Sequence, residues 1–341
     1  MDGRAGREWQ VLDAGRPPRF RLRIVTGAAV LGALVAGCGG DTGGDGGNAP
    51  AAPNGPAKAE AVTEAQAKAI FARYEKTNNK ANAQVSDELL RSNETGPMLE
   101  ADLVGNKRIR SKHGKKIDAF YYRDPQFYIP RTTGPAWFAV TAAETEEGNT
   151  ELLVFVDTGG GSYKSAVGVW LADGRKFPAI ARNADGSATA VTEGAALGVG
   201  ADVSEYLTST AGGKKPAAGL APGPLTSKLG KSWAKTVRKT NGGLRWAGGT
   251  SWKARPQPVY ALKTADGGAL VMSVSTQTQT YTALRENVWF QPDPSYYGLG
   301  PKRYYKRFSG ERLWAFATHV PPSGPADVVA RSTHAIAASG S

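Results

Sequence analysis

Two patterns of apolar residues follow one another along the chain, a helical pattern first and a strand-like pattern after it. Residues 62–92 have the helical pattern. Thr63, with Gln66 three residues later, has the form of a capping box, in which each side chain binds the other residue's backbone N–H. Ser86 is placed to cap a second, short helix. The apolar residues that recur on one face of the first helix are Ile70, Phe71, Tyr74 and Ala81.

Short runs of apolar, β-branched and aromatic residues come next, separated by Gly, Asp, Asn and Pro. Runs of this kind predict strands joined by turns. Helices followed by consecutive strands indicate an α+β domain with an antiparallel sheet. The predicted strands are 118–122, 136–141, 151–157, 166–171, 176–182 and 187–192.

The same order recurs in the second half, which begins with a predicted helix at 225–240. We therefore expect an α+β fold of two tandem domains, 62–198 and 199–341, each with N-terminal helices packed on an antiparallel sheet. The Gly- and Pro-rich segment 212–224 is either a loop of the second domain or itself the linker. The strands expected in this half are 259–263, 269–284, 312–320 and 327–338.

The N-terminal segment has the parts of a secretory signal peptide. Basic residues 16–23 precede the uncharged run Ile24–Ala36, which is shorter than the roughly 20 residues of a membrane span. The run ends in Val-Ala-Gly-Cys38, which resembles a bacterial lipobox. That resemblance implies a signal peptide at 1–37 and a diacylglyceryl group on the Cys38 thiol. The alternative is a plain signal peptide cleaved at a site of small residues, with Cys38 incidental.

Residues 39–61 form a tether in this interpretation. They include no aromatic or large aliphatic residue and are rich in Gly, Ala, Pro and Asn, so they cannot build a core. A flexible coil of this length reaches roughly 25–30 Å. Because Cys38 is the only cysteine in the chain, lipidation leaves no thiol for a disulfide, a metal or catalysis.

The chain is basic, with a formal net charge of +12. Without residues 1–37 the net charge is +9, from 36 basic and 27 acidic residues. Such a protein is attracted to anionic lipid headgroups or wall polyanions, although the charge also fits a solvated surface without a specific ligand. Nucleic acid is not an expected partner, because an exported lipoprotein rarely meets it.

Candidate catalytic motifs are incomplete. Asp157-Thr158-Gly159 matches half of an aspartic protease site, which needs two carboxylates, and no second copy follows a strand. Ser232 and Lys235 have the Ser-x-x-Lys spacing of penicillin-binding enzymes without the partner motifs. His319 and His334 are expected opposite Val328 and Leu313 on the last two strands, about 20 Å apart and thus too distant to share a metal. We expect no cofactor and no metal.

Two aromatic and basic segments, 120–131 and 288–308, occupy similar places in the two halves. Rings beside Arg and Lys can bind sugars, polyanions or a protein partner, and they can equally be strand residues that line the sheets. The candidate interaction residues are Tyr121, Tyr122, Arg123, Tyr296, Tyr297, Lys302, Arg303, Tyr304, Tyr305, Lys306 and Arg307.

The stretch ARYEKTNNKANAQVSDELL (72–90), together with the lipobox, resembles a family of uncharacterised actinobacterial lipoproteins over residues 62–338. The order of helices and strands in each half is similar to the nuclear-transport-factor-2-like superfamily, which implies strongly bent, cone-shaped sheets. The implied location is the outer face of the cytoplasmic membrane, with a lipid anchor on Cys38. We expect a non-enzymatic binding or scaffolding protein; the alternatives are an envelope hydrolase and a transporter's solute-binding lipoprotein.

Overall fold

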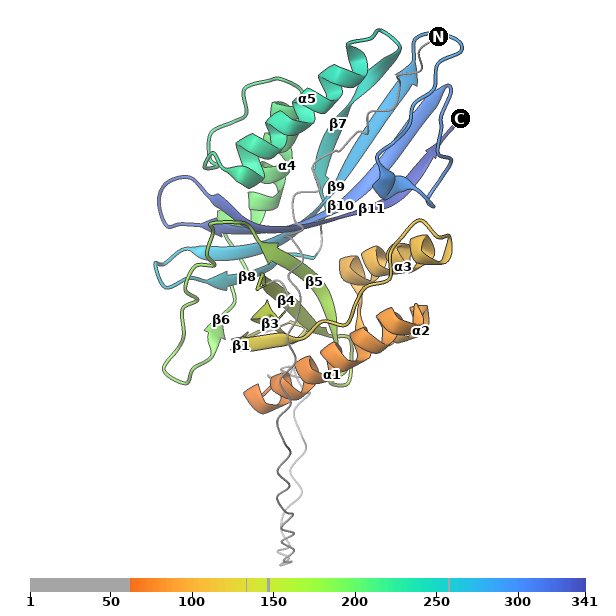
Figure 1. Ribbon diagram of the computed structural model, residues 1–341. Helices are drawn as coiled ribbons and strands as arrows, with labels where there is room; N and C mark the ends of the chain where they lie inside the picture. The colour runs from red at the N-terminus through yellow and green to blue at the C-terminus, as the bar shows by residue number, and fades with distance from the viewer. Residues whose placement is uncertain (1–61, 133, 146–147, 257) are drawn as a thin grey trace, which may run out of the picture. The chain divides into compact units, whose positions relative to one another are not determined.

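A computed structural model describes residues 62–132, 134–145, 148–256 and 258–341 (Figure 1). These residues belong to one compact unit that spans 59–341. The predicted signal peptide, Cys38 and the tether lie outside the described residues. Within the described part of the chain, none of the helices has the length and apolarity that crossing a membrane requires.

Three helices precede the strands. The predicted capping box is confirmed: the Thr63 hydroxyl accepts from the Gln66 backbone N–H over 3.2 Å, and Gln66 Oε1 accepts from the Thr63 N–H over 2.8 Å. The Ser86 cap is confirmed as well, because its hydroxyl accepts from the Leu89 N–H over 3.3 Å. The helices are α1 (Glu64–Gln84), α2 (Asp87–Asn93) and α3 (Gly96–Arg110), of which α3 is not predicted from the sequence.

The strands form one large antiparallel sheet of nine strands, in the order β1-β3-β4-β5-β11-β10-β9-β7, with β8 also paired to β9. Two short strands, β2 (Pro130–Arg131) and β6 (Ala188–Thr189), pair in parallel outside it. The strands of the large sheet are β1 (Tyr122–Tyr128), β3 (Trp137–Glu144), β4 (Thr150–Asp157), β5 (Tyr163–Leu171), β7 (Trp246–Ala254), β8 (Tyr260–Lys263), β9 (Ala269–Ala283), β10 (Arg307–Val320) and β11 (Asp327–Gly340).

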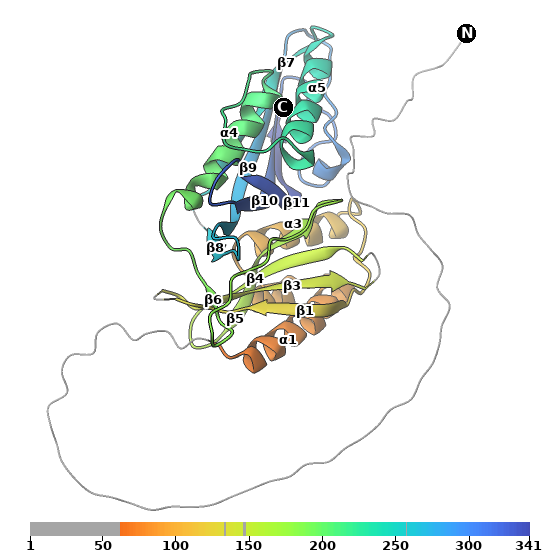
Figure 2. The same ribbon diagram turned by 90° about the vertical axis from the view of Figure 1, so that its left-hand side faces the viewer.

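The sheet bends so that its two halves pack face to face. One apolar cluster joins Leu152 and Val154 of β4 to Met272 of β9 and Leu313 of β10. The outer face of the first half is covered by α1, and the outer face of the second half is covered by α4 (Val199–Ala211) and α5 (Leu229–Asn241). Figures 1 and 2 show this arrangement, with α1 at one end and α4 and α5 beside the other half of the sheet.

The α+β class with an antiparallel sheet is confirmed, whereas the division into two tandem domains is not. The first-half strands and the second-half strands meet in one sheet, where β5 pairs with β11 through Leu171–Ala330 and Trp170–Arg331. The order of helices before strands does occur in both halves. The cone-shaped superfamily fold is not confirmed.

Several predicted elements are corrected. The expected strand at 118–122 begins at Tyr122 instead, and the expected strands at 176–182 and 187–192 reduce to isolated bridges and the two-residue β6. His334 does pair with Leu313, but His319 lies opposite Asp327, because an irregularity between Ala317 and Thr318 shifts the register by one residue.

Candidate functional site

The ends of β7, β9, β10 and β11 meet at the end of the molecule that lies away from α1 (Figures 1 and 2). The Leu284 N–H donates to the Arg245 carbonyl over 2.8 Å, and the Ala283 N–H donates to the Lys306 carbonyl over 2.8 Å. The Lys306 N–H in turn donates to the Ser341 carbonyl over 2.7 Å. These bonds bring the turn before β7, the segment between β9 and β10, and the C-terminal residue together.

Exposed apolar and basic side chains gather at this end. Trp289 keeps 46% of its surface exposed and Tyr305 keeps 56%. The Arg303 guanidinium lies 4.5 Å from the centre of the Trp289 ring, which is a cation–π contact. We call the following exposed residues the apex surface: Leu244, Leu284, Trp289, Lys302, Arg303, Tyr305, Lys306 and Arg307.

The remaining rings of the second aromatic segment are buried. Tyr296, Tyr304 and Phe308 are at most 1% exposed and pack with Trp246 and Tyr281. Burial raises the pKa of Tyr304, and it raises that of Tyr296 most strongly. The segment 288–308 therefore contributes some of its aromatic rings to the core and others to the surface.

Tyr297 is intermediate between these two groups. It is half-buried, and the Lys302 ammonium lies 5.8 Å from the centre of its ring. The contact holds Lys302 beside an aromatic face without burying it, since Lys302 stays exposed.

The first aromatic segment lies apart from the apex surface, at β1. Tyr121 and Arg123 are exposed, whereas Tyr122 packs against α1 and donates from its hydroxyl to Glu151. β1 and β7 are at opposite ends of the strand order. The two segments that look alike in sequence therefore do not form one site.

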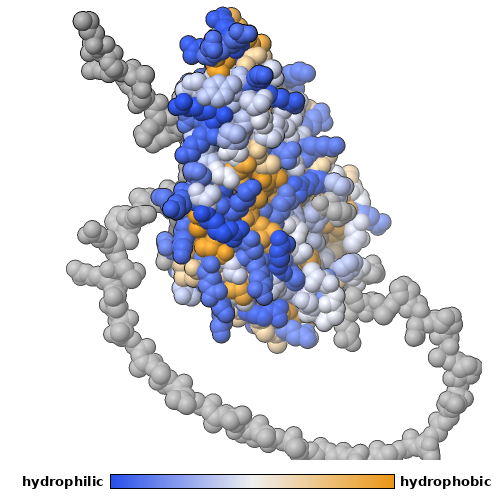
Figure 3. Space-filling view, turned by 90° about the vertical axis from the view of Figure 1, so that its right-hand side faces the viewer, coloured by the Kyte–Doolittle hydropathy of each residue, from blue (hydrophilic) through white to orange (hydrophobic). Residues whose placement is uncertain are grey.

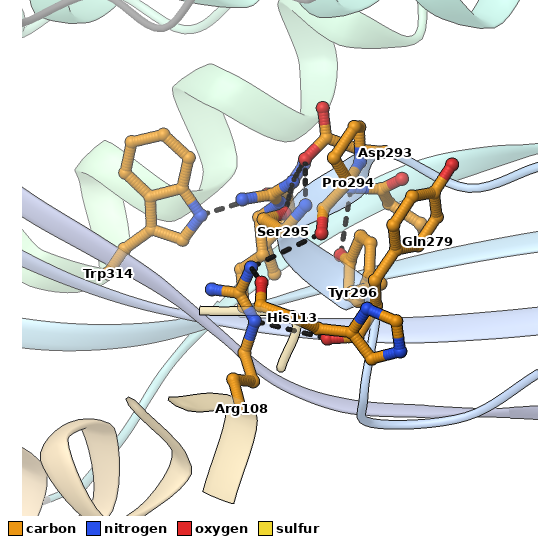
Figure 4. Close-up of polar contacts among 11 residues, drawn as sticks. Arg108, His113, Gln279, Asp293, Pro294, Ser295, Tyr296 and Trp314 are labelled. Atoms are coloured by element: carbon orange, nitrogen blue, oxygen red, sulfur yellow. Dashed lines mark hydrogen bonds and ion pairs between the residues drawn. The ribbon is translucent and has the colours of Figure 1, made fainter. Parts of the chain in front are cut away.

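A polar network beneath the apex surface holds in place the segment between β9 and β10, which we call the apex loop (Figure 4). Arg312 of β10 donates to Asp293 Oδ1 over 3.0 Å and to the Ser295 hydroxyl over 2.6 Å. Its guanidinium also lies 4.8 Å from the centre of the Tyr296 ring. Arg312 is only 8% exposed, so this network is nearly removed from solvent and fixes the loop geometry.

Arg108 ties α3 to the same loop. It donates to the carbonyls of Tyr297 and Pro294, each over 3.2 Å, and to that of His113 over 3.3 Å. Burial lowers the pKa of Arg108, and the neighbouring Asp293 opposes this effect. The apex loop is thus anchored from both halves of the sequence.

A cluster of buried carboxyl groups lies between the helices and the first-half strands, and sequence analysis missed it. Glu94 is completely buried; its Oε1 accepts from Asn78 Nδ2 over 2.7 Å, and its Oε2 has no donor among the described residues. Burial raises the pKa of Glu94 and that of Asp102. The neighbouring Asp102 raises the pKa of Glu94 further. Burial also raises the pKa of Glu151 to about 8. Burial and the nearby carboxyl of Asp102 thus both disfavour the ionised form of Glu94.

This cluster has acid–base chemistry but little access. Glu94 is 0% exposed and Glu151 is 5% exposed, so a substrate cannot reach either without displacing a helix. Within the described residues, no three His, Cys, Asp or Glu side chains are arranged to hold a metal ion. We interpret the cluster as part of the core. Glu94 directly follows the polar residues Ser92 and Asn93, so no apolar pattern around it indicates that it is buried.

The incomplete catalytic motifs are turns and exposed faces. Asp157 accepts at Oδ1 from the Gly159 N–H over 2.9 Å and at Oδ2 from the Gly161 N–H over 3.3 Å, as in a glycine turn. Lys235 points to solvent on α5. His319 Nε2 lies 3.0 Å from Asp266 Oδ2. Among the residues that the structure describes, no hydrogen bond or ion pair joins Asp157, Ser232 or Lys235 to a second catalytic group, whereas His319 has the Asp266 carboxylate beside it.

An open pocket of about 390 Å³ lies elsewhere, between the start of β3 and β8. Its walls include Trp137, Val191, Tyr260 and Ala261, and none of its lining residues is charged. A pocket without convergent polar groups does not define a catalytic or ligand site.

Comparisons with known proteins agree with the lipoprotein interpretation. The chain is 30% identical over 295 residues to a protein of Streptomyces coelicolor named "Uncharacterized lipoprotein SCO6871", an alignment that covers 81% of this chain and 82% of that relative. No solved structure matches the chain. The family described as "Domain of unknown function (DUF8094)" matches residues 58–340. The chain therefore belongs to this family, and its relative is a lipoprotein.

Proposed function

We propose that the protein is a lipid-anchored, extracytoplasmic binding protein that captures an anionic polymer of the cell envelope on its apex surface. The observation that carries the proposal is the clustering of four exposed cations, Lys302, Arg303, Lys306 and Arg307, beside exposed Trp289 and Tyr305. In this proposal Cys38 carries the lipid, the anchored end is at the outer face of the cytoplasmic membrane, and the activity is binding and not catalysis.

The position of the apex surface supports a partner in the wall. The predicted tether joins the described part of the chain at α1, and Figures 1 and 2 place α1 at the end opposite the apex. The apex surface is thus the end of the described part of the chain that is remote from the point where the predicted tether joins it. This distance supports a partner other than the lipid that holds the anchor.

The geometry of the surface supports an extended anionic partner. Guanidinium and ammonium groups on a loop that Arg312 and Arg108 already hold in place need little ordering on binding. The rings of Trp289 and Tyr305 add flat apolar contact area beside those charges. Cations beside exposed rings are the features that bind charged, sugar-containing polymers.

The test replaces Lys302, Arg303, Lys306 and Arg307 together by Ser and measures co-sedimentation of the purified protein with cell-wall fragments. Exposed charges contribute little to stability, so the variant should fold as the wild type does. Its bound fraction should fall by about tenfold or more at low salt. The matched control replaces four exposed lysines remote from the apex, Lys76, Lys80, Lys176 and Lys263, by Ser, which removes the same charge.

The control variant should keep its binding to the wall. Equal loss in both variants would show that only net charge matters and would refute a specific site. Unchanged binding of the apex variant would refute the proposal outright.

A further inference from the structure

A second surface continues from the apex surface along one side of the sheet. On β9 the sequence Thr-Gln-Thr-Gln-Thr-Tyr-Thr alternates between two faces. Gln277 accepts from the Trp314 indole N–H over 2.9 Å, and Gln279 donates to the Tyr296 hydroxyl over 3.1 Å, so both amides lie on the side that α4 and α5 cover. The threonines between them therefore lie on the opposite side.

The register extends this alternation to the neighbouring strands. Thr278 lies opposite Ser251 of β7 and Glu311 of β10, and Thr280 lies opposite Gly249 and Ser309. Directly opposite residues share a face of the sheet. We call the resulting side of these strands the open face: Gly249, Ser251, Thr278, Thr280, Thr282, Ser309, Glu311 and His334.

The open face is accessible and consists mostly of short side chains. Each of its residues is half-buried or exposed, and Ser251, Thr282 and His334 are exposed. Figure 3 looks onto this side of the molecule; its upper half shows pale side chains of intermediate hydropathy with strongly hydrophilic ones at the rim. α4 and α5 cover the opposite side of the sheet (Figure 1), whereas on the side of the open face α3 packs against β11, where Asp102 of α3 interacts with His334.

The hydroxyls of the open face are available to a ligand. Among the described residues, no side-chain hydrogen bond occupies the hydroxyls of Ser251, Thr278, Thr280, Thr282 or Ser309. Of these residues, Thr278, Thr280 and Ser309 are half-buried, and Ser251 and Thr282 are exposed. Thr276, by contrast, accepts from Arg255 over 3.0 Å. A solvated sheet face commonly carries long charged side chains, whereas the centre of this face has short hydroxyls, each able to donate and to accept, beside the one long charged side chain of Glu311.

The spacing of these hydroxyls suits a repeating ligand. Residues two apart on a strand are about 6.6–6.8 Å apart, and neighbouring strands are about 4.8 Å apart, so the hydroxyls form a regular two-dimensional array. β9 and β10 are interior strands of the sheet, so the array is rigid. One end of the array is continuous with the apex surface, because Thr282 lies opposite Arg307.

We propose that the open face binds the hydroxyl groups of the same polymer whose anionic groups bind the apex surface. The ligand is then an extended chain that carries both negative charges and hydroxyls, such as an acidic polysaccharide, and its hydroxyls hydrogen bond to Thr278, Thr280 and Ser309. This inference rests on the proposed function and names the chemical class of its ligand.

The test uses the full chain in a polyoxyethylene detergent, which has no sugar headgroup to compete. Thr278→Val, Thr280→Val and Ser309→Ala are combined, because Val keeps the shape of Thr and favours strands. Binding is measured by calorimetry with polygalacturonate, which has charges and hydroxyls, and with polyphosphate, which has charges alone. The control combines hydroxyl deletions away from the open face, Thr192→Val, Ser162→Ala and Ser209→Ala.

The open-face variant should lose about tenfold or more in affinity for polygalacturonate and stay within about twofold of the wild type for polyphosphate, since only the first ligand hydrogen bonds to the array. The control should match the wild type with both polymers. Unchanged affinity for polygalacturonate would overturn the inference and leave the apex surface as the binding site. An equal loss with both polymers would also overturn it. If the wild type binds neither polymer, the proposed function fails as well.

Discussion

The side chain of Arg312, in the middle of β10, donates from Nη2 to Asp293 Oδ1 over 3.0 Å and thereby holds the loop that forms the apex surface. Their side chains are 10% and 21% exposed, so the pair is largely shielded from solvent. The same Nη2 donates to the Ser295 hydroxyl over 2.6 Å, and Asp293 also accepts from the Ser295 N–H over 2.9 Å. One buried cation thus orders several residues of an otherwise exposed loop.

Arg312→Gln should destabilise the protein by about 2–4 kcal/mol, because it leaves the Asp293 carboxylate shielded and without its cation. Arg285→Gln, a change at an exposed arginine of the same loop, should stay within about 0.5 kcal/mol of the wild type. Urea unfolding followed by circular dichroism measures both. Equal stabilities of the two variants would mean that the network does not hold the loop.

Two adjacent glycines of β7 should respond in opposite ways to the same change. A Cβ on Gly248 would collide with the backbone carbonyl of Thr280, whereas a Cβ on Gly249 would meet nothing within 4 Å. Gly248→Ala should therefore destabilise the protein by about 2 kcal/mol or more, through strain in the β7–β9 pairing. Gly249→Ala should be neutral or stabilising by up to about 1 kcal/mol, since it restricts the unfolded chain. Thermal unfolding compares them, and similar midpoints would contradict the β7–β9 register.

The stability of the protein should depend on pH through Glu151. Burial raises the pKa of this carboxyl to about 8, above its value of about 4.5 in an unfolded chain. Between these values the folded state binds the proton and the unfolded state does not, so the stability that this group contributes is fully present below about pH 4.5 and is lost as the pH rises to 8. The slope is at most about 1.4 kcal/mol per pH unit.

Glu151→Gln removes the titrating group and keeps a similar shape. The free energy of unfolding of the wild type should fall relative to that of Glu151→Gln as the pH rises from 5 to 8. Parallel curves over this range would show that Glu151 is already ionised in the folded protein.

Local signals in the sequence predicted the elements that they determine directly. The Thr63 capping box, the Ser86 cap, the strands at 151–157 and 166–171, and the pairing of His334 with Leu313 all follow from short-range patterns. The pairing of β5 with β11 depends on two residue pairs that are distant in sequence. No local pattern reports such contacts, so the single sheet was not predictable.

The elements that were missed lack strong local signals. No side-chain hydrogen bond caps α3 or α4, and α4 follows Gly198. β7 contains Gly248 and Gly249, which weaken a strand pattern. The register error at His319 arises from one irregular residue beside Ala317.

Sequence patterns also could not separate the buried from the exposed residues of the candidate site. Tyr304 is 0% exposed and the next residue, Tyr305, is 56% exposed. Both are tyrosines within one aromatic and basic segment, so composition could not separate the core ring from the surface ring. The four cations around them, Lys302, Arg303, Lys306 and Arg307, are all exposed, and their role in binding stays a prediction.

Limited proteolysis tests whether the halves of the sheet hold together after the chain is cut. Trypsin should cut the predicted tether first and then the exposed Lys214–Lys215 pair in the loop after α4. Because β5 and β11 pair across the halves, the two fragments should co-elute in gel filtration under native conditions. Early cleavage between 136 and 192, or fragments that separate freely, would contradict this arrangement.

Lipidation depends on one residue. Cys38→Ala should release the protein into the medium or leave an uncleaved precursor, because no other cysteine can accept the lipid. Membrane fractionation with immunoblotting measures this. Membrane retention of a processed Cys38→Ala protein would contradict the anchor.

The central claim is that the apex surface binds an anionic envelope polymer, and the salt dependence of that binding tests it most directly. Affinity for purified wall polyanion is measured between 50 and 200 mM salt for the wild type and for the variant with Ser at Lys302, Arg303, Lys306 and Arg307. Release of counterions from the polymer predicts that wild-type affinity falls by about ten- to hundredfold over this range, and that the variant binds weakly with a much shallower dependence. Equal slopes for the two proteins would contradict the claim.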